Sequence, residues 1–407
     1  MPTTFQELES AIDEYLLLED RLVVRLLCAT VVANRMPDLD PTWLFLISNS
    51  GGGKSELLTA LCYADGLWQQ DDLSVNTFIS GATRGGVETS LLHRLPKRNP
   101  IIVFKDLTML LDKDPMAAAQ IFSQLRLIYD GQLNKSFGTG EDVKVKIHLG
   151  LIAGTTSAIE DVSAKQASMG QRAIRFLMKQ PGRREQARRV LKSKNEKELR
   201  LKVGAAFLDY LDKTVVVPKE IPDLTDETVE DIVNLSDLST LARSSVIRDQ
   251  YSRDKRVIRI DLPEMPGRMA KQLKNLGHAM MAMNNGGMLP IDNKILYQIA
   301  LDSIPSGRKS VMMAATKYAK VELESLSADL GLPSETVKME VQDLVALKIM
   351  VKEKSYQTKF LYHLKEEYRE VISKFENIEM TTQALEETVP LPDEGPGVAL
   401  EQAGALY

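Results

Sequence analysis

A glycine-rich turn ending in lysine and serine is the clearest chemical feature of this sequence. It lies within WLFLISNSGGGKSELLTAL, residues 43–61. Consecutive glycines let the backbone turn its N–H groups inward, and the lysine ammonium and serine hydroxyl that follow suit phosphate oxygens and Mg²⁺. The usual pattern, G-x-x-x-x-G-K-[ST], has glycine where this chain has Ser48. Because serine is small enough for such a loop, we interpret the stretch as a nucleotide loop rather than a flexible turn with a surface lysine. The expected nucleotide-binding residues are Ser50, Gly51, Gly52, Gly53, Lys54, Ser55 and Glu56.

A second chemical feature is an acidic residue that follows an apolar run. The segment NPIIVFKD, residues 99–106, predicts a buried strand that ends at Asp106. Nucleotide hydrolases place a carboxylate there to hold Mg²⁺ or to polarise the attacking water. The common order is aspartate then glutamate, whereas here Lys105 takes the first position and Asp106 the second. Thr155 and Thr156 end another apolar run, and Thr156 is the candidate for contacting the terminal phosphate.

The elements around these residues predict a parallel α/β sheet. Apolar runs at 43–48, 73–80, 99–106, 145–156 and 172–180 indicate strands, with helices expected over 4–35, 56–63 and 114–131. Alternation of strands with helices is typical of a parallel sheet, where loops at the carboxyl ends of strands bind phosphate.

Composition limits the alternatives. The chain has 407 residues, is 44% hydrophobic and has a net charge of −5, so DNA binding would depend on local basic patches. Two cysteines and four scattered histidines make no metal or disulfide pattern. No apolar run is long enough to span a membrane and no signal peptide is evident, so we expect a cytoplasmic protein.

Five segments together resemble the AAA+ ATPases of bacteriophages and integrated mobile elements. In order, they are DPTWLFLISNSGGGKSELL, IIVFKDLTMLL, IYDGQLNKSFGTG, LGLIAGTTSAI and MGQRAIRFLM. The resemblance covers about residues 10–280 and extends more loosely to MCM-type replicative helicases; Ser48 and the missing glutamate depart from it. It implies ATP and Mg²⁺ as ligands and a hexameric ring as the assembly. It also implies that Arg172, with Arg175 as the fallback, is an arginine finger for the neighbouring subunit, and that Arg268 contacts the γ-phosphate.

Residues 131–148 alternate around the turn TGED and predict a β-hairpin. The residues alone leave two interpretations open: a solvated edge protected by lysines, or a DNA contact. The resemblance favours the second, because MCM-like helicases carry a hairpin here that projects into the central pore. The expected DNA-contacting residues are Lys135, Phe137, Lys144 and Lys146.

The rest of the chain is predicted to be helical and then mixed. Residues 178–202 are strongly basic, which suits either a solvated helix or a nucleic-acid path. Residues 308–366 look like a winged helix, but its second helix carries Glu335, Glu340 and Asp343 against Lys338 and Lys348, so protein docking is as well supported as DNA binding. The tail after Asn377 has six acidic residues and neither lysine nor arginine, and we expect it to be disordered and to bind a partner or shield basic surface.

The predicted organisation is an AAA+ P-loop NTPase core with a helical lid, followed by a winged-helix domain. The boundaries are 1–40 for an N-terminal helical segment, 41–180 for the core, 181–306 for the basic linker and lid, 307–376 for the winged helix and 377–407 for the tail. Two function classes remain: a DNA helicase, translocase or replication initiator, and a regulatory or scaffold ATPase that acts as a loader, defence or assembly component.

Overall fold

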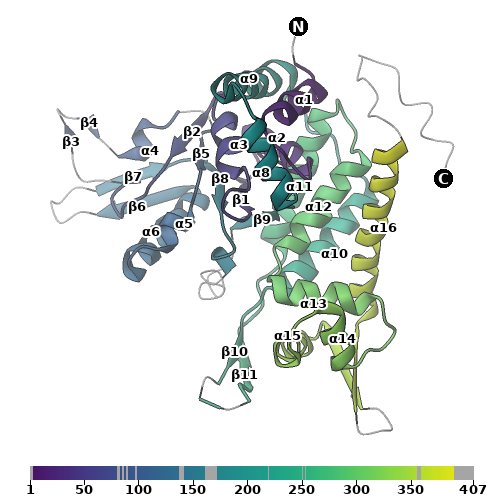
Figure 1. Cartoon of the computed structure of the whole chain (residues 1–407). Helices are drawn as coiled ribbons and strands as arrows, with labels where there is room; N and C mark the ends of the chain where they lie inside the picture. The colour runs from purple at the N-terminus through teal and green to yellow at the C-terminus, as the bar shows by residue number, and fades with distance from the viewer. Residues whose placement is uncertain are drawn as a thin grey trace.

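A five-stranded parallel sheet organises the first half of the chain in the computed structural model (Figure 1). The structure describes residues 3–79, 83–84, 87–88, 90–96, 99–136, 142–160, 172–218, 220–249, 251–252, 254–354 and 359–388. The strands are β1 (Trp43–Ile47), β2 (Leu67–Gln70), β5 (Ile101–Phe104), β8 (Gly150–Thr155) and β9 (Ala173–Leu177). Their order across the sheet is β2-β5-β8-β1-β9, and every pairing is parallel. The α/β prediction is therefore confirmed at the level of this sheet.

The central strands are buried on both faces, which explains why β1 and β5 are continuous apolar runs. Alternate residues of a strand point to opposite faces, and in β1 Leu44 and Leu46 enter one core cluster while Trp43 and Phe45 contact the other. The first cluster is covered by helices α1 (Phe5–Tyr15), α2 (Leu22–Arg35), α3 (Lys54–Leu61), α9 (Glu196–Asp209), α10 (Asp226–Ala242), α11 (Gly267–Met283) and α12 (Pro290–Asp302). The second cluster is covered mainly by α4 (Leu91–Arg94), α5 (Thr108–Leu111) and α6 (Pro115–Tyr129).

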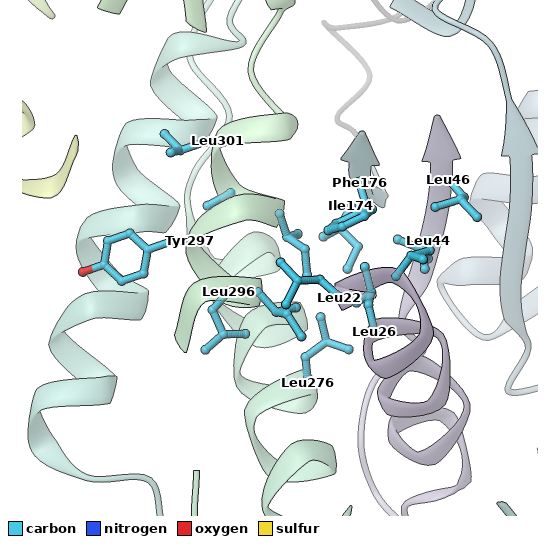
Figure 2. Close-up of a cluster of buried hydrophobic side chains, with 14 of the residues drawn as sticks. Leu22, Leu26, Leu44, Leu46, Ile174, Phe176, Leu276, Leu296, Tyr297 and Leu301 are labelled. Carbon is cyan, nitrogen blue, oxygen red and sulfur yellow. The ribbon is translucent and has the colours of Figure 1, made fainter. Parts of the chain in front are cut away.

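Figure 2 shows how the helical half of the chain packs on the sheet. Leucines of α2, α11 and α12 meet the inward side chains of β1 and β9, and the cluster is continuous across them. A buried ion pair adds to this packing, because Arg25 of α2 donates to Asp292 of α12 at 2.6 Å and both side chains are removed from solvent. The helices of the second half therefore form one body with the sheet through a shared core.

Two strand predictions were wrong in position. Residues 73–79 of the strand expected over 73–80 are not in a strand. The strand beside β5 is instead β2, where the sequence LWQQ is too polar to stand out. The expected strand at 145–156 is divided between β7 (Asp142–Lys146) and β8. The predicted hairpin is confirmed, because β6 (Gln132–Ser136) pairs antiparallel with β7.

The basic linker is helical, containing α8 (Arg183–Lys192) and the start of α9, which continues into a π-helical turn, Tyr210–Thr214. A second hairpin, β10 (Val246–Arg248) with β11 (Val257–Ile260), projects away from the helices in Figure 1. Two short two-residue strands, β3 (Thr83–Arg84) and β4 (Val87–Glu88), make a further hairpin near α4.

The C-terminal unit consists of α13 (Ser306–Thr316), α14 (Leu323–Leu330), α15 (Ser334–Ala346) and a hairpin of β12 (Met350–Lys354) and β13 (Phe360–Leu364). The helix α16 (Glu366–Thr388) follows, so helix continues well past Asn377, where we expected disorder to begin. Among the described residues, no helix is both long and apolar enough to cross a bilayer.

Asp343 of α15 is engaged inside the molecule, whereas Glu335 is exposed and pairs with Lys338 of the same helix. Asp343 receives ion pairs from Arg308 of α13, at 2.8 Å, and from Arg248 of β10. Arg308 also donates to the backbone carbonyls of Ala242 and Ser244 at the end of α10. These contacts tie α15 to the elements before it, so Asp343 has a structural role within the protein.

Candidate functional site

The glycine-rich loop joins the end of β1 to the start of α3. Gly51 and Gly53 have φ values of +80° and +82°, a region that side chains with Cβ avoid, so two of the three glycines are required by the backbone. The helix begins at Lys54, and the N–H groups of its first turn have no partner from an earlier helical turn. The loop therefore presents N–H donors and the positive end of a helix dipole at one place.

Lys54 lies under this loop and is only 6% exposed. Its Nζ donates to the carbonyl oxygens of Ser48, at 2.8 Å, and Asn49, at 3.1 Å, and to the hydroxyl Oγ of Ser48 at 2.9 Å. Burial lowers the pKa of the Lys54 ammonium, while the nearby Asp106 carboxylate acts to raise it. Ser48, the residue that departs from the usual pattern, thus accepts hydrogen bonds from the loop lysine through both its carbonyl and its hydroxyl.

Three neighbouring strands end around this lysine. Because β8 lies between β1 and β5, the carboxyl ends of these strands bring together Ser48, Thr155 and the turn at Asp106. The backbone N–H of Thr108 donates to Asp106 Oδ1 at 2.9 Å, and the Thr108 hydroxyl lies 3.5 Å from that of Thr156. The strand order therefore places the loop, Asp106 and Thr156, all singled out from the sequence, at the same edge of the sheet.

Gly154 allows this close approach. A Cβ added at Gly154 would lie 2.5 Å from the backbone oxygen of Lys105 and 3.1 Å from Cδ1 of Leu58. The carbonyl of Gly154 accepts a 2.7 Å bond from the N–H of Leu107. Since only glycine leaves room for the turn after β5 to lie on β8, this residue sets the position of Asp106.

A pocket of about 360 Å³ opens over the loop. Its floor is the loop and the first turn of α3, and its walls come from the end of α1 and from α8 and α9. The lining residues are Tyr15, Leu16, Leu17, Gly51, Gly52, Gly53, Lys54, Ser55, Glu56, Gln186, Arg189, Val190, Ser193, Glu196 and Arg200. Reasoning from the sequence identified the floor but missed the walls, since residues 15–17 and 186–200 lie far from the loop in the chain.

Glu56, expected to contact nucleotide, is engaged with the pocket wall. It accepts a hydrogen bond from the Tyr15 hydroxyl and pairs with Arg200 at 2.6 Å, and Arg200 also donates to the Tyr15 oxygen at 3.1 Å. Burial, with the neighbouring Glu56, raises the pKa of the Tyr15 phenol. This polar cluster holds α1, α3 and α9 together at the pocket rim.

The residues present fit Mg²⁺, which prefers oxygen ligands and keeps several waters. Ser55 offers a hydroxyl at the pocket floor, and Asp106 is an exposed carboxylate whose charge acts on Lys54. Both are the oxygen donors predicted from the sequence. When bound with a nucleotide, the ion would neutralise charge on the outer phosphates.

Arg172 and Arg268 lie elsewhere. Arg172 directly precedes β9, at the amino-end edge of the sheet, and its guanidinium pairs with Asp130 at 2.9 Å. Arg268 lines a cavity of about 790 Å³ at the same edge, with Asp130, Lys146 and Lys271. Neither arginine lines the pocket over the loop. The structure therefore does not bring the predicted γ-phosphate contact at Arg268 to the loop of its own chain.

The fallback finger is excluded by burial. Arg175 is 2% exposed and points from the middle of β9 into the protein, where burial lowers its pKa to about 10. A side chain in that position is inaccessible to a neighbouring subunit, so Arg175 is a structural residue.

The hairpin lysines do not form one surface. Lys144 and Lys146 pair with Asn134 and Gln132 across β6 and β7, so these four side chains share a face. Lys135 pairs with Val143 on the opposite face, and its Nζ lies 3.5 Å from Oδ1 of Asn76. Lys144 and Lys146 are exposed, whereas Phe137 lies outside the described residues.

No protein-family model matches this chain, and no curated protein does. Among solved structures it is similar to the A form apo structure of the NrS-1 C-terminal region, with 10% identity and a TM-score of 0.31. That alignment covers 89% of this chain and 76% of the other. A TM-score this low does not establish a common fold.

Proposed function

We propose that this protein is an ATP-hydrolysing P-loop motor of the AAA+ type that acts on DNA as a ring. The observation that carries the proposal is the strand order β5-β8-β1, which gathers Asp106, Thr156 and the Lys54 loop at one edge. Each residue type matches a task in phosphoryl transfer: a lysine for phosphate charge, a hydroxyl for the terminal phosphate, and a carboxylate for metal or water.

In this proposal the nucleotide replaces contacts that the loop now makes with itself. The ammonium of Lys54 would exchange the carbonyls of Ser48 and Asn49 for phosphate oxygens. The backbone N–H groups of residues 51–55 would donate hydrogen bonds to the same phosphates. Asp106 would orient or polarise the attacking water. Thr156, whose hydroxyl lies 3.5 Å from that of Thr108, would contact the terminal phosphate.

Hydrolysis would be completed by a second copy of the chain. Arg172 directly precedes β9, at the end of the sheet opposite to the loop. A strand rises about 3.3 Å per residue, so the two ends of a five-residue strand are roughly 13 Å apart. Arg172 is therefore remote from the nucleotide of its own chain, but a head-to-tail contact between copies would present it to the next one. In that contact Arg172 would exchange Asp130 for phosphate. Arg268 lies at the same edge and would also face the nucleotide of the neighbouring copy.

The C-terminal unit is proposed to be a winged helix that docks on protein. Its second helix, α15, directs Asp343 towards Arg248 and Arg308 instead of solvent. If the C-terminal unit docks on protein, the DNA contact must come from elsewhere, and Lys144 and Lys146, the exposed lysines of β7, are favoured in the sheet domain.

A second candidate function is ATP-dependent assembly without translocation. It is favoured by Lys105, which stands where an aspartate is usual and pairs with Asp71 at 3.0 Å. The ATPase rate, measured without DNA and with single- or double-stranded DNA, separates the two. Stimulation by DNA supports the motor, a slow rate that depends on protein concentration but not on DNA supports the assembly function, and absence of nucleotide binding refutes both.

A further inference from the structure

The helix α8 and the start of α9 carry an unusual concentration of positive charge. Residues 183–202 contain nine lysines and arginines and three glutamates, a net charge of +6 in a chain whose net charge is −5. No side chain of α8 is buried, so this charge is presented at the surface of the protein.

The outward side of α8 presents this charge as a stripe. Arg184, Arg188 and Lys192 are exposed and four residues apart, so they lie one above another on the helix surface. Within the described part of the chain, none of the three makes an ion pair. Leu191, three residues after Arg188, is 87% exposed on the same side. Successive cations are separated by about 6 Å along the axis, comparable to two phosphates of a DNA strand at about 3.4 Å each.

The inward side of the same helix forms a wall of the pocket over the glycine-rich loop. Gln186 donates to the carbonyl oxygen of Gly51, and Arg189 donates to the carbonyl of Glu14 at 2.6 Å and to that of Asp13. Because apolar packing does not hold α8, these polar contacts with the loop and α1 set its position. A force on the outer side would therefore be transmitted to the loop backbone.

We propose that the outward side of α8, defined by Arg184, Arg188 and Lys192, binds the phosphate backbone of a nucleic acid. Through Gln186 and Arg189 the same helix couples this binding to the nucleotide pocket. The coupling rests on the proposed nucleotide site, whereas the nucleic-acid surface does not. A membrane surface is the less suitable partner, since a helix that lies in a bilayer needs a broad apolar face and the apolar residues of α8 are only Ala187, Val190 and Leu191.

The test compares two triple variants of the full chain with equal loss of charge. The first is Arg184→Gln, Arg188→Gln, Lys192→Gln. The control is Lys213→Gln, Lys317→Gln, Lys348→Gln, three exposed lysines away from α8. Affinity for a labelled single-stranded DNA is measured by anisotropy over a range of salt concentrations, and affinity for a fluorescent ATP analogue with and without DNA.

Three lost phosphate contacts should lower the salt slope by about 2, at roughly 0.7 per contact, and weaken binding at 0.1 M salt by about 100-fold. The α8 variant should bind the ATP analogue as the parent does when DNA is absent, and the effect of DNA on that affinity should disappear. The control should keep the parent's DNA affinity and slope.

Several outcomes would overturn the proposal. Unchanged DNA affinity in the α8 variant, or an equal loss in the control, would place the contact elsewhere. Loss of binding to anionic vesicles without any change in DNA binding would make α8 a membrane contact. If saturating DNA still shifts the nucleotide affinity of the α8 variant, the coupling is wrong. If the parent fails to bind the analogue, the proposed function fails, and loss of DNA binding in the variant still supports the surface.

Discussion

Replacement of Lys54 by alanine tests the assignment of the loop most directly. The side chain is buried, and its ammonium makes three contacts of 2.8 to 3.1 Å with Ser48 and Asn49. A nucleotide must take the ammonium away from these acceptors, so the net gain is smaller than three new bonds. One charge-assisted hydrogen bond contributes about 1.5–3 kcal/mol. We therefore expect Lys54→Ala to weaken ATP binding by about 10- to 150-fold.

The same change should leave the fold largely intact. The three lost hydrogen bonds have a charged donor, so each would destabilise the loop by about 1.5–3 kcal/mol if nothing offset it. However, the pKa of Lys54 is lowered by burial, which means that the folded state disfavours the charged form. At neutral pH the buried ammonium therefore costs stability, and this cost disappears as pH rises through the lowered pKa. Because the pKa is lowered in spite of these bonds, removal of the buried charge offsets most of the lost bonding, and the net loss of stability should stay below about 2 kcal/mol.

Calorimetric titration with ATP and denaturant unfolding measure the two quantities. Lys105→Ala is the matched control, because Lys105 stands beside Asp106 but pairs with Asp71. Its ATP affinity should equal that of the parent. The reasoning is refuted if Lys54→Ala binds ATP as tightly as the parent, or if Lys105→Ala loses as much affinity.

Four further outcomes follow from the geometry. Asp106→Asn should retain ATP binding and lose hydrolysis in a steady-state phosphate-release assay; unchanged turnover would move the catalytic carboxylate elsewhere. Arg172→Ala should bind ATP but hydrolyse it slowly, and mixing it with Lys54→Ala protein should restore some activity; no rescue in demonstrably mixed oligomers argues against a role in the neighbouring subunit. The two exposed lysines of β7, changed to alanine together, should lower the salt slope of single-strand binding by about 1.4, whereas the lysine on the other hairpin face should have no effect. Gly154→Ala should destabilise the fold by about 1–3 kcal/mol in denaturant unfolding and displace the turn after β5, since the added Cβ meets backbone; wild-type stability would contradict this.

Local signals were enough to predict the loop, three of the strands and the hairpin. The strands β1 and β5 are uninterrupted apolar runs, β9 is apolar apart from Arg175, and the hairpin at 131–148 has alternation around a turn. The edge strand β2 was missed because its residues are half polar and only one neighbour, β5, pairs with it. Strands were therefore predicted correctly where burial requires apolar residues at most positions.

Contacts between distant segments could not be read from the sequence. Tyr15 and Arg200 meet Glu56 at the pocket rim, although 41 residues separate Tyr15 from Glu56. Arg175 shares a motif with Arg172, and only the packing of β9 distinguishes a buried arginine from a surface one. Likewise, the division of the hairpin lysines between two faces depends on strand register, which the turn sequence TGED alone did not determine.

The parallel sheet itself explains why one chain would be an incomplete enzyme under the proposed function. All five strands run in the same direction, so their carboxyl ends share one edge, with Lys54 and Asp106, and their amino ends share the other, with Arg172 and the Arg268 cavity. Strand length keeps these groups apart within a chain. A symmetric two-copy contact would join like edges, whereas only a head-to-tail contact presents an arginine edge to a loop edge. In an open row of copies joined in this way, the first and the last copy each keep one edge without a partner. Closing the row into a ring gives every loop edge an arginine edge.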